Sequence, residues 1–411
     1  MLEKSNTDVS SCQLKNVLSF IFLLNIFAMI RGYAFSNFLE AILFIFVICH
    51  SGLRSDLFNT LKYKPVKFLM IYLLWICIAQ SWGSGPFEAR IQEVLSWRKM
   101  FLLPIGLVIF EKTKAVNRVS GVMLWTCIFF LALSYFIYFF FPAVGLWGRG
   151  YVEIMQNHST QGVLFSFASL YCIQRAWKGS LTLASRLAWV GIGSAFAINV
   201  VFITDGRSGY LAFVIMALAY GISLFKTHRY KVLASFFLIV VAMISSDTVQ
   251  YKLNEGIHGF FNVGNSSAMS SMGIRRVMWI ETIDIIKQYP LLGVGGGDAY
   301  RETYSDQVID YQDWKGVVTD NPHQQFLLIT AQYGLIGLMI FLYWLILIFK
   351  EILRIKSIFP LAVFAALVTL SFFNGIIGDF IIGRWIFIGV FVLLFLNDNQ
   401  NKRLDNKNGI S

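Results

Sequence analysis

The chain has 411 residues, of which 57% are hydrophobic and 14% charged, and its formal net charge is +11. A soluble domain carries roughly 25% charged residues, so this composition, with a mean hydropathy of +0.64, excludes an ordinary soluble globular protein. The apolar residues come in long runs, and the alternation typical of a membrane β-barrel is absent. We therefore expect an all-α polytopic membrane protein with about 12 transmembrane helices.

Twelve apolar stretches are candidates for helices that cross a bilayer, which takes about 20 residues each. They fall at residues 17–34, 38–53, 67–83, 100–111, 120–145, 158–174, 186–203, 209–225, 231–246, 324–349, 358–374 and 382–397. The fourth is the shortest, and its helix could begin earlier, between Glu93 and Lys99. We divide the chain into transmembrane helices at 1–246, a loop domain at 247–322, further transmembrane helices at 323–397 and a tail at 398–411.

The lysines and arginines predict the orientation, because they concentrate on short cytoplasmic loops. With the N-terminus in the cytoplasm, most of the 34 basic residues fall on cytoplasmic segments, including the loop 226–231. Both termini are then cytoplasmic, and residues 247–322 lie outside. This topology explains the positive net charge, so we expect membrane lipids and no nucleic acid as partners.

The segment 247–322 is polar and is not of low complexity, so we expect a small ordered domain that caps the bundle. Within it, Val277–Gln288 has Trp279 at helical spacing from Ile283 and Ile286, which predicts an amphipathic helix. Pro290 follows, and the cluster 293–297 predicts a tight glycine turn. That cluster lacks the Lys-Ser/Thr pair of a phosphate-binding loop.

Charged and polar side chains gather at the outer ends of the predicted helices. Arginine offers a fork of donors that suits phosphate oxygens, and charge at membrane depth usually faces a partner or a cavity. The set therefore indicates a site for a pyrophosphate-bearing ligand. It comprises Arg98, Lys99, Arg149, His158, Arg207, Arg275, Arg276, His323, Asp379 and Arg384.

Some members of this set have simpler interpretations. Arg98, Lys99 and Arg149 can be anchors whose charged ends reach the interface, and His158 can be a local hydrogen-bonding residue. No cluster has the spacing of metal ligands, so we expect no metal.

The stretch around His323 resembles the signature of the O-antigen ligase family. His323-Gln324 is followed by nine residues and then by Gly334-Leu335-Ile336-Gly337, and the family has a histidine, then Asn, Ser or Gln, then nine residues and Gly-x-x-Gly.

Further segments are similar to the same family. Arg207 precedes Leu211 in the family's spacing, although Gly206 stands where relatives often have serine. The Gly-Ile-Arg275 start of the loop helix, the Pro-Leu-Leu-Gly-Val-Gly stretch from residue 290 and the loop 378–384 are also similar.

The resemblance implies a GT-C-like bundle in the bacterial inner membrane with an active site that faces the periplasm. Such enzymes transfer a glycan from undecaprenyl diphosphate to a sugar hydroxyl of lipid A-core. The donor linkage already stores the energy, so no cofactor, ATP or metal is expected. The relatives also imply direct, inverting displacement.

The resemblance also assigns roles. His323 is the expected general base, with Asp379 as its orienting partner or an alternative base. Arg207 and Arg275 are the expected diphosphate clamps, with Arg384 as a weaker third. Further candidates for substrate binding are Arg276, Arg149, His158 and Gln324. The alternative for His323 is a histidine that caps a helix or binds the donor.

Three other functions stay open. A polymerase of O-antigen or exopolysaccharide uses the same donor with a second lipid-linked glycan as acceptor. A protein O-oligosaccharyltransferase is usually longer, with an extra extracytoplasmic portion after its last span. A twelve-helix secondary transporter usually has its long loop in the cytoplasm between spans six and seven, whereas the long loop here is predicted outside, after span nine.

Overall fold

The computed structural model describes residues 2–110, 116–141, 154–177, 181–204, 206–261, 271–308 and 319–408, and the regular structure in these parts is helical throughout. The all-α prediction is thus confirmed. The helices are α1 Leu2–Ala28, α2 Tyr33–Cys49, α3 Ser51–Thr60, α4 Lys64–Ala79, α5 Phe87–Ser96, η1 Trp97–Phe101, α6 Leu102–Phe110, α7 Val116–Phe140, α8 His158–Ala176, α9 Leu183–Ile198, η2 Asn199–Ile203, α10 Arg207–Ile244, α11 Asp247–Phe261, α12 Ser271–Gln288, α13 Ala299–Val308, α14 Gln325–Ile355, α15 Ile358–Ser371 and α16 Phe380–Asn408.

Several of these helices are apolar enough for a multi-pass membrane protein. Among the described residues, 3 helices have the length and composition to cross a bilayer, or up to 5 if each of two bent pairs is one span. Other predicted spans fall on shorter helices, such as α6 with 9 residues, which is about 14 Å long. The number twelve and the orientation therefore remain predictions.

Helix α10 covers two predicted spans, 209–225 and 231–246. A straight helix from Arg207 to Ile244 would be about 57 Å long. Yet Arg207 Nε donates to the carbonyl oxygen of Lys252 at 3.1 Å, and Ser246 Oγ donates to that of Val201 at 2.9 Å. Both ends of α10 therefore lie at the same end of the molecule, so the helix doubles back, in agreement with two spans.

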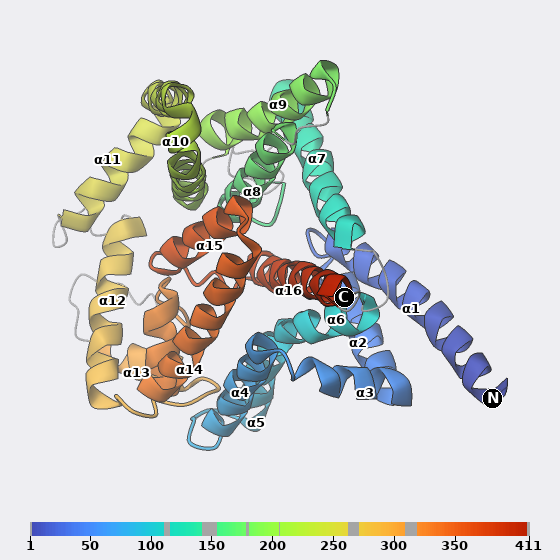
Figure 1. Ribbon diagram of the computed structural model, residues 1–411. Helices are drawn as coiled ribbons and strands as arrows, with labels where there is room; N and C mark the ends of the chain where they lie inside the picture. The colour runs from blue at the N-terminus through green and yellow to red at the C-terminus, as the bar shows by residue number, and fades with distance from the viewer. Residues whose placement is uncertain are drawn as a thin grey trace.

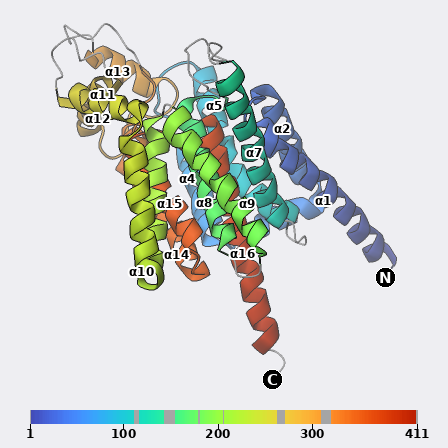
Figure 2. The ribbon, with the colours of Figure 1, turned by 90° about the horizontal axis from the view of Figure 1, so that it is seen from above.

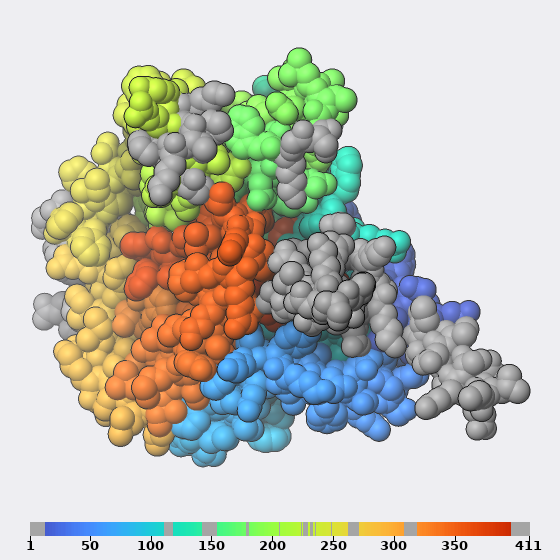
Figure 3. All heavy atoms as spheres, in the orientation of Figure 1, coloured from blue at the N-terminus to red at the C-terminus, as the bar shows by residue number. Residues whose placement is uncertain are grey.

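The helices of the segment 247–322 lie together. Figure 2 shows α11, α12 and α13 at one end of the bundle, while both termini point toward the other end. Helix α12 packs against α14 (Figure 1), and the space-filling view shows its residues directly beside those of α14 and α15 (Figure 3). It begins at Ser271, earlier than the predicted Val277, and ends at Gln288 as expected.

A break in α14 receives the turn after α12. Gly334 has φ 68° and ψ −177° inside α14, which frees two carbonyl groups. The amide of Val294 donates to the oxygen of Ala331 at 2.8 Å, and that of Gly295 to the oxygen of Gln332 at 2.9 Å. A Cβ on Gly334 would lie 2.0 Å from the oxygen of Leu291, so glycine is required there by contact as well as by φ.

The other face of the same turn meets the N-terminal half of the chain. The amide of Gly296 donates to the oxygen of Ala79 at 3.2 Å, and Glu93 accepts from the amide of Gly297 and from the hydroxyl of Tyr333. Trp97 Nε1 donates to that hydroxyl at 3.1 Å. The predicted glycine turn thus joins α4, α5 and α14.

Candidate active site

His323 lies just before α14. Its backbone is in the left-handed region at φ 54°, and its amide donates to Asn321 Oδ1 at 2.8 Å. Gln324 is the N-cap of α14, since its side chain accepts from the amide of Leu327. Because Gln324 caps α14, the presence of a histidine at position 323 is not explained by helix capping. The side-chain oxygen of Gln324 is engaged by the amide of Leu327.

The imidazole of His323 is half-buried and oriented by Asn374. Asn374 forms a hydrogen bond with the ring, while its Nδ2 donates to Ser208 Oγ at 3.1 Å. Asn374 therefore links the imidazole to Ser208, and a neutral imidazole with one nitrogen held in this way has its other nitrogen for a second partner. Burial, and next the charge of Arg275, lower the pKa of His323 below its usual value. The imidazole is therefore neutral near neutral pH.

Arg275 supplies positive charge beside His323. Its Nη1 donates to the carbonyl oxygen of Phe373 at 3.2 Å, and within the described parts of the chain no carboxylate pairs with it. Burial, and next the charge of Arg207, lower the pKa of Arg275, but a guanidinium stays protonated in a protein. Two neighbouring guanidinium groups with one unpaired charge form a site for an anion.

Arg207 begins α10 and is more fully engaged. Its Nη2 pairs with Glu255 Oε2 at 2.8 Å, its Nη1 donates to Ser271 Oγ at 2.9 Å, and its Nε donates to the oxygen of Lys252. Three of the five N–H groups of an arginine thus tie α10 to α11 and α12. Since Glu255 offsets much of this charge, Arg275 is the stronger of the two expected clamps.

Three other candidates lie near these residues or outside the described chain. Arg276 Nη1 donates to the oxygen of Phe260 at 2.9 Å, and its guanidinium stands 5.6 Å from the Phe260 ring centroid, so it joins α12 to α11. His158 begins α8, and a Cβ on Gly206 would lie 2.9 Å from its carbonyl oxygen, which places its backbone beside the start of α10. Arg149 is outside the described residues.

Asp379 stands at the start of α16. Its Oδ1 accepts from the amides of Ile381 at 2.9 Å and Ile382 at 2.7 Å, which caps α16. Lys99 Nζ donates to the carbonyl oxygen of Gly378 at 2.8 Å. The structure thus gives Asp379 a helix-capping role, and the residue that orients His323 is Asn374.

Arg384 is buried in an ion pair with Glu40. Its Nη2 donates to Glu40 Oε2 at 2.9 Å, its Nε donates to Oε1 at 2.5 Å, and its side chain is 3% exposed. Arg98 Nε also lies 3.5 Å from Glu40 Oε2. This cluster joins α2, η1 and α16. Because Glu40 occupies two N–H groups of Arg384 and offsets its charge, this guanidinium is poorly suited to bind a diphosphate. Arg384 therefore belongs to a different cluster from Arg275 and Arg207.

Asn374 and Ser208 were not singled out from the sequence. Asn374 closes the predicted span 358–374, and the signal for it is the Asn374-Gly375 pair. A Cβ on Gly375 would lie 2.7 Å from Asn321 Nδ2, so glycine lets this loop approach the segment before His323. The amide of Ile377 also donates to Gln325 Oε1 at 3.1 Å.

Within the described parts of the chain, no three His, Cys, Asp or Glu side chains converge to hold a metal ion. The candidate site is therefore an arrangement of one neutral imidazole, two guanidinium groups and the polar side chains of Asn374 and Ser208. Such a site can bind an anionic group and accept a proton beside it.

Comparison with known families agrees with this chemistry. Residues 192–342 match the family described as O-Antigen ligase, and no curated protein matches the chain. The matched segment contains Arg207, Arg275 and His323. The family implies an enzyme that transfers glycans from lipid-linked donors. The chain thus carries an O-antigen ligase family domain at residues 192–342, and the family that the sequence resembles is confirmed.

Proposed function

We propose that the chain is an O-antigen ligase that transfers a glycan from undecaprenyl diphosphate to a sugar hydroxyl of lipid A-core, at the periplasmic face of the bacterial inner membrane. The observation that carries the proposal is the placement of Arg275 beside His323: Trp279, one helical turn after Arg275, donates to the carbonyl oxygen of Pro322 at 2.9 Å, and Arg275 donates to that of Phe373 at 3.2 Å. A proton acceptor and an anion clamp side by side are what a transfer away from a diphosphate requires.

The arginines act on the leaving group. As the bond between the anomeric carbon and the phosphate oxygen breaks, the electron pair stays on that oxygen, and negative charge grows on the diphosphate. Arg275 has N–H groups beyond the one used by Phe373, and Arg207 contributes those that Glu255, Ser271 and Lys252 leave unused. Charge-assisted bonds that strengthen as charge develops lower the barrier.

His323 acts on the acceptor. The sugar hydroxyl oxygen attacks the anomeric carbon, and its proton passes to the unprotonated nitrogen of the imidazole. Asn374 holds the ring so that this nitrogen stays available. The step forms one carbon–oxygen bond and breaks another, needs neither a metal nor ATP, and inverts the anomeric centre. His323 then releases its proton to water.

The second candidate is a polymerase, because an enzyme that transfers from the same donor to a second lipid-linked glycan needs the same clamp and base. The acceptor separates the two. In the bacterium that carries the gene, a deletion strain complemented with wild type or His323→Ala is compared by gel electrophoresis of lipopolysaccharide. A ligase defect leaves bare core while polymer accumulates on the lipid carrier. Core that bears a single repeat would instead identify a polymerase, and unchanged lipopolysaccharide would reject both.

A further inference from the structure

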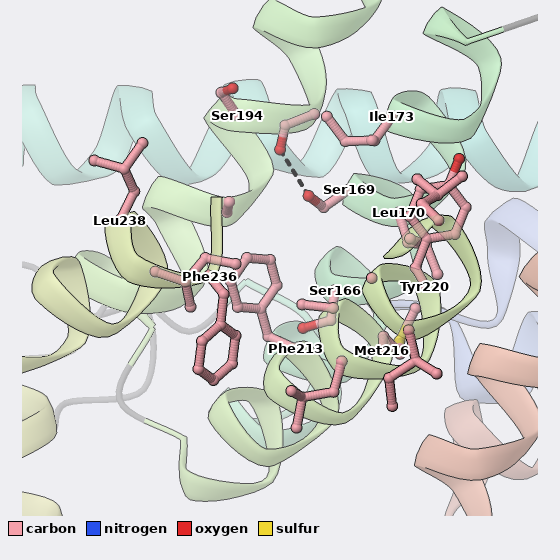
Figure 4. A pocket seen from close by; sticks show the side chains of 18 of the residues that line it. Ser166, Ser169, Leu170, Ile173, Ser194, Phe213, Met216, Tyr220, Phe236 and Leu238 are labelled. Atoms are coloured by element: carbon pink, nitrogen blue, oxygen red, sulfur yellow. Dashed lines mark hydrogen bonds between the residues drawn. The ribbon is translucent and has the colours of Figure 1, made fainter. Parts of the chain in front are cut away.

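An apolar cavity of about 520 Å³ lies between α8, α9 and α10. Its wall includes Leu170 from α8, Ala197 from α9, and Phe213, Met216 and Tyr220 from α10, and Figure 4 shows several of these side chains around the opening. No charged residue belongs to the wall in the part of the chain that the structure describes.

Two of the three serines in this wall, Ser166 and Ser169, donate to backbone carbonyl groups. Ser169 Oγ donates to the carbonyl oxygen of Gly193 at 2.8 Å, drawn as a dashed line in Figure 4. Ser166 Oγ donates to that of Gly162 at 2.7 Å. Because these hydroxyl groups already have partners, the wall offers an occupant packing and few hydrogen bonds. An aliphatic chain fits such a wall better than a sugar does.

The cavity and the anion site share one helix. Arg207 is the first residue of α10, and Phe213 stands six residues later, which is about 9 Å along the axis. Leu224, also in the wall, stands about 26 Å from Arg207 on the same measure. The wall therefore begins within two helical turns of Arg207, which is within reach of the chain of an amphiphile whose anionic head binds there.

We propose that this cavity holds the polyprenyl chain of the donor whose diphosphate binds at Arg275 and Arg207; this rests on the proposed function. Inside a bilayer, a chain gains little from leaving lipid, since lipid tails are as apolar as the wall. The cavity instead selects by shape and sets the diphosphate at the correct depth. Filling the cavity should then cost selectivity for the chain and spare the chemistry at His323.

The test compares two donors that carry the same glycan diphosphate on an undecaprenyl chain or on a two-isoprene chain, with purified protein in detergent. Ala197→Trp fills the cavity. Ala188→Trp is the matched control, because Ala188 is exposed, is absent from the cavity wall and lies nine residues away on the opposite face of α9.

Wild type and Ala188→Trp should favour the long chain in kcat/KM by about tenfold or more. Ala197→Trp should lose most of that preference and keep its rate with the short chain, which also shows that it is folded. Equal preference in Ala197→Trp and wild type, or none in wild type, overturns the proposal. Absence of transfer from both donors by wild type rejects the proposed function itself.

A photoreactive undecaprenyl diphosphate gives a measurement that does not depend on the folding of a variant. It should crosslink wild-type protein on α8, α9 and α10, and excess undecaprenyl diphosphate should compete. Crosslinks on other helices, or equal competition by phosphatidylglycerol, would show that the cavity holds ordinary lipid and would overturn the proposal.

Discussion

Substitution of His323 by glutamine separates base catalysis from binding. Glutamine keeps a hydrogen-bonding side chain but cannot accept a proton at neutral pH. Loss of a general base costs about 100- to 10,000-fold in rate. The whole effect should appear at pH 7, because the pKa of His323 lies below its usual value near 6.5, so more than about three quarters of the wild-type imidazoles are neutral there.

The pH dependence of kcat/KM follows from the same geometry. A base works only when deprotonated, so wild-type activity should be nearly constant above about pH 7.5 and should fall as the pH drops through the lowered pKa. The charge of Arg275 disfavours protonation of His323. In Arg275→Gln the pKa should therefore rise, and the acid limb should move to higher pH. Arg276→Gln is the matched control, because Arg276 donates to the carbonyl oxygen of Phe260. Its activity should fall with acid at the same pH as that of wild type.

The assay measures transfer from a purified donor to lipid A-core in detergent, over about pH 5–8, with donor affinity measured separately. His323→Gln should bind donor and turn over almost none. If it keeps most of its turnover, or if the wild-type profile shows no acid limb, His323 is not the base. Asp379 would then become the leading candidate, although its Oδ1 caps α16.

Further predictions concern the clamp, the second polar cluster, the turn and the cofactor. Arg275→Lys should lower kcat/KM by roughly 30- to 1000-fold, about 2–4 kcal/mol, because lysine lacks the fork; near-wild-type kinetics would remove it from the site. Arg384→Leu leaves Glu40 buried without its main partner, so it should lower stability by about 3–5 kcal/mol; a melting temperature equal to wild type would contradict this. Gly334→Ala should detach the turn 290–297 and abolish transfer, with protease cleavage after α12 as the readout; resistance equal to wild type would count against it. Transfer should survive EDTA and need no ATP, and a strict requirement for a divalent metal in the purified assay would refute the mechanism.

Local signals in the sequence located the elements that hold the site. The apolar run after residue 324 predicted α14, the spacing of Trp279 and Ile283 predicted α12, and the glycines at 293–297 predicted the turn. Each signal depends on a few neighbouring residues, because helix periodicity and glycine conformation are local properties.

The pairing of charges could not be predicted in the same way. Glu40 lies inside one predicted apolar span and Arg384 inside another. The sequence alone gives no indication that these two charges form a pair. Only packing of α2 against α16 shows that the two neutralise each other. Likewise, the Asn374-Gly375 pair indicates only a loop, and the importance of Asn374 arises from its position between Ser208 and His323.

The family's spacing between histidine and glycine has a physical meaning in this fold. Helices α12 and α14 are joined at one end by the contact of Leu291 with Gly334, and at the other by Trp279 Nε1, which donates to the oxygen of Pro322 at 2.9 Å. Leu291 is twelve positions after Trp279, and Gly334 is twelve positions after Pro322. The two segments match in length, so docking the turn at Gly334 brings the first turns of α12 beside the start of α14. Arg275, one helical turn before Trp279, then lies beside His323. The number of residues between His323 and Gly334 therefore determines that Arg275 of α12 lies beside His323 at the start of α14.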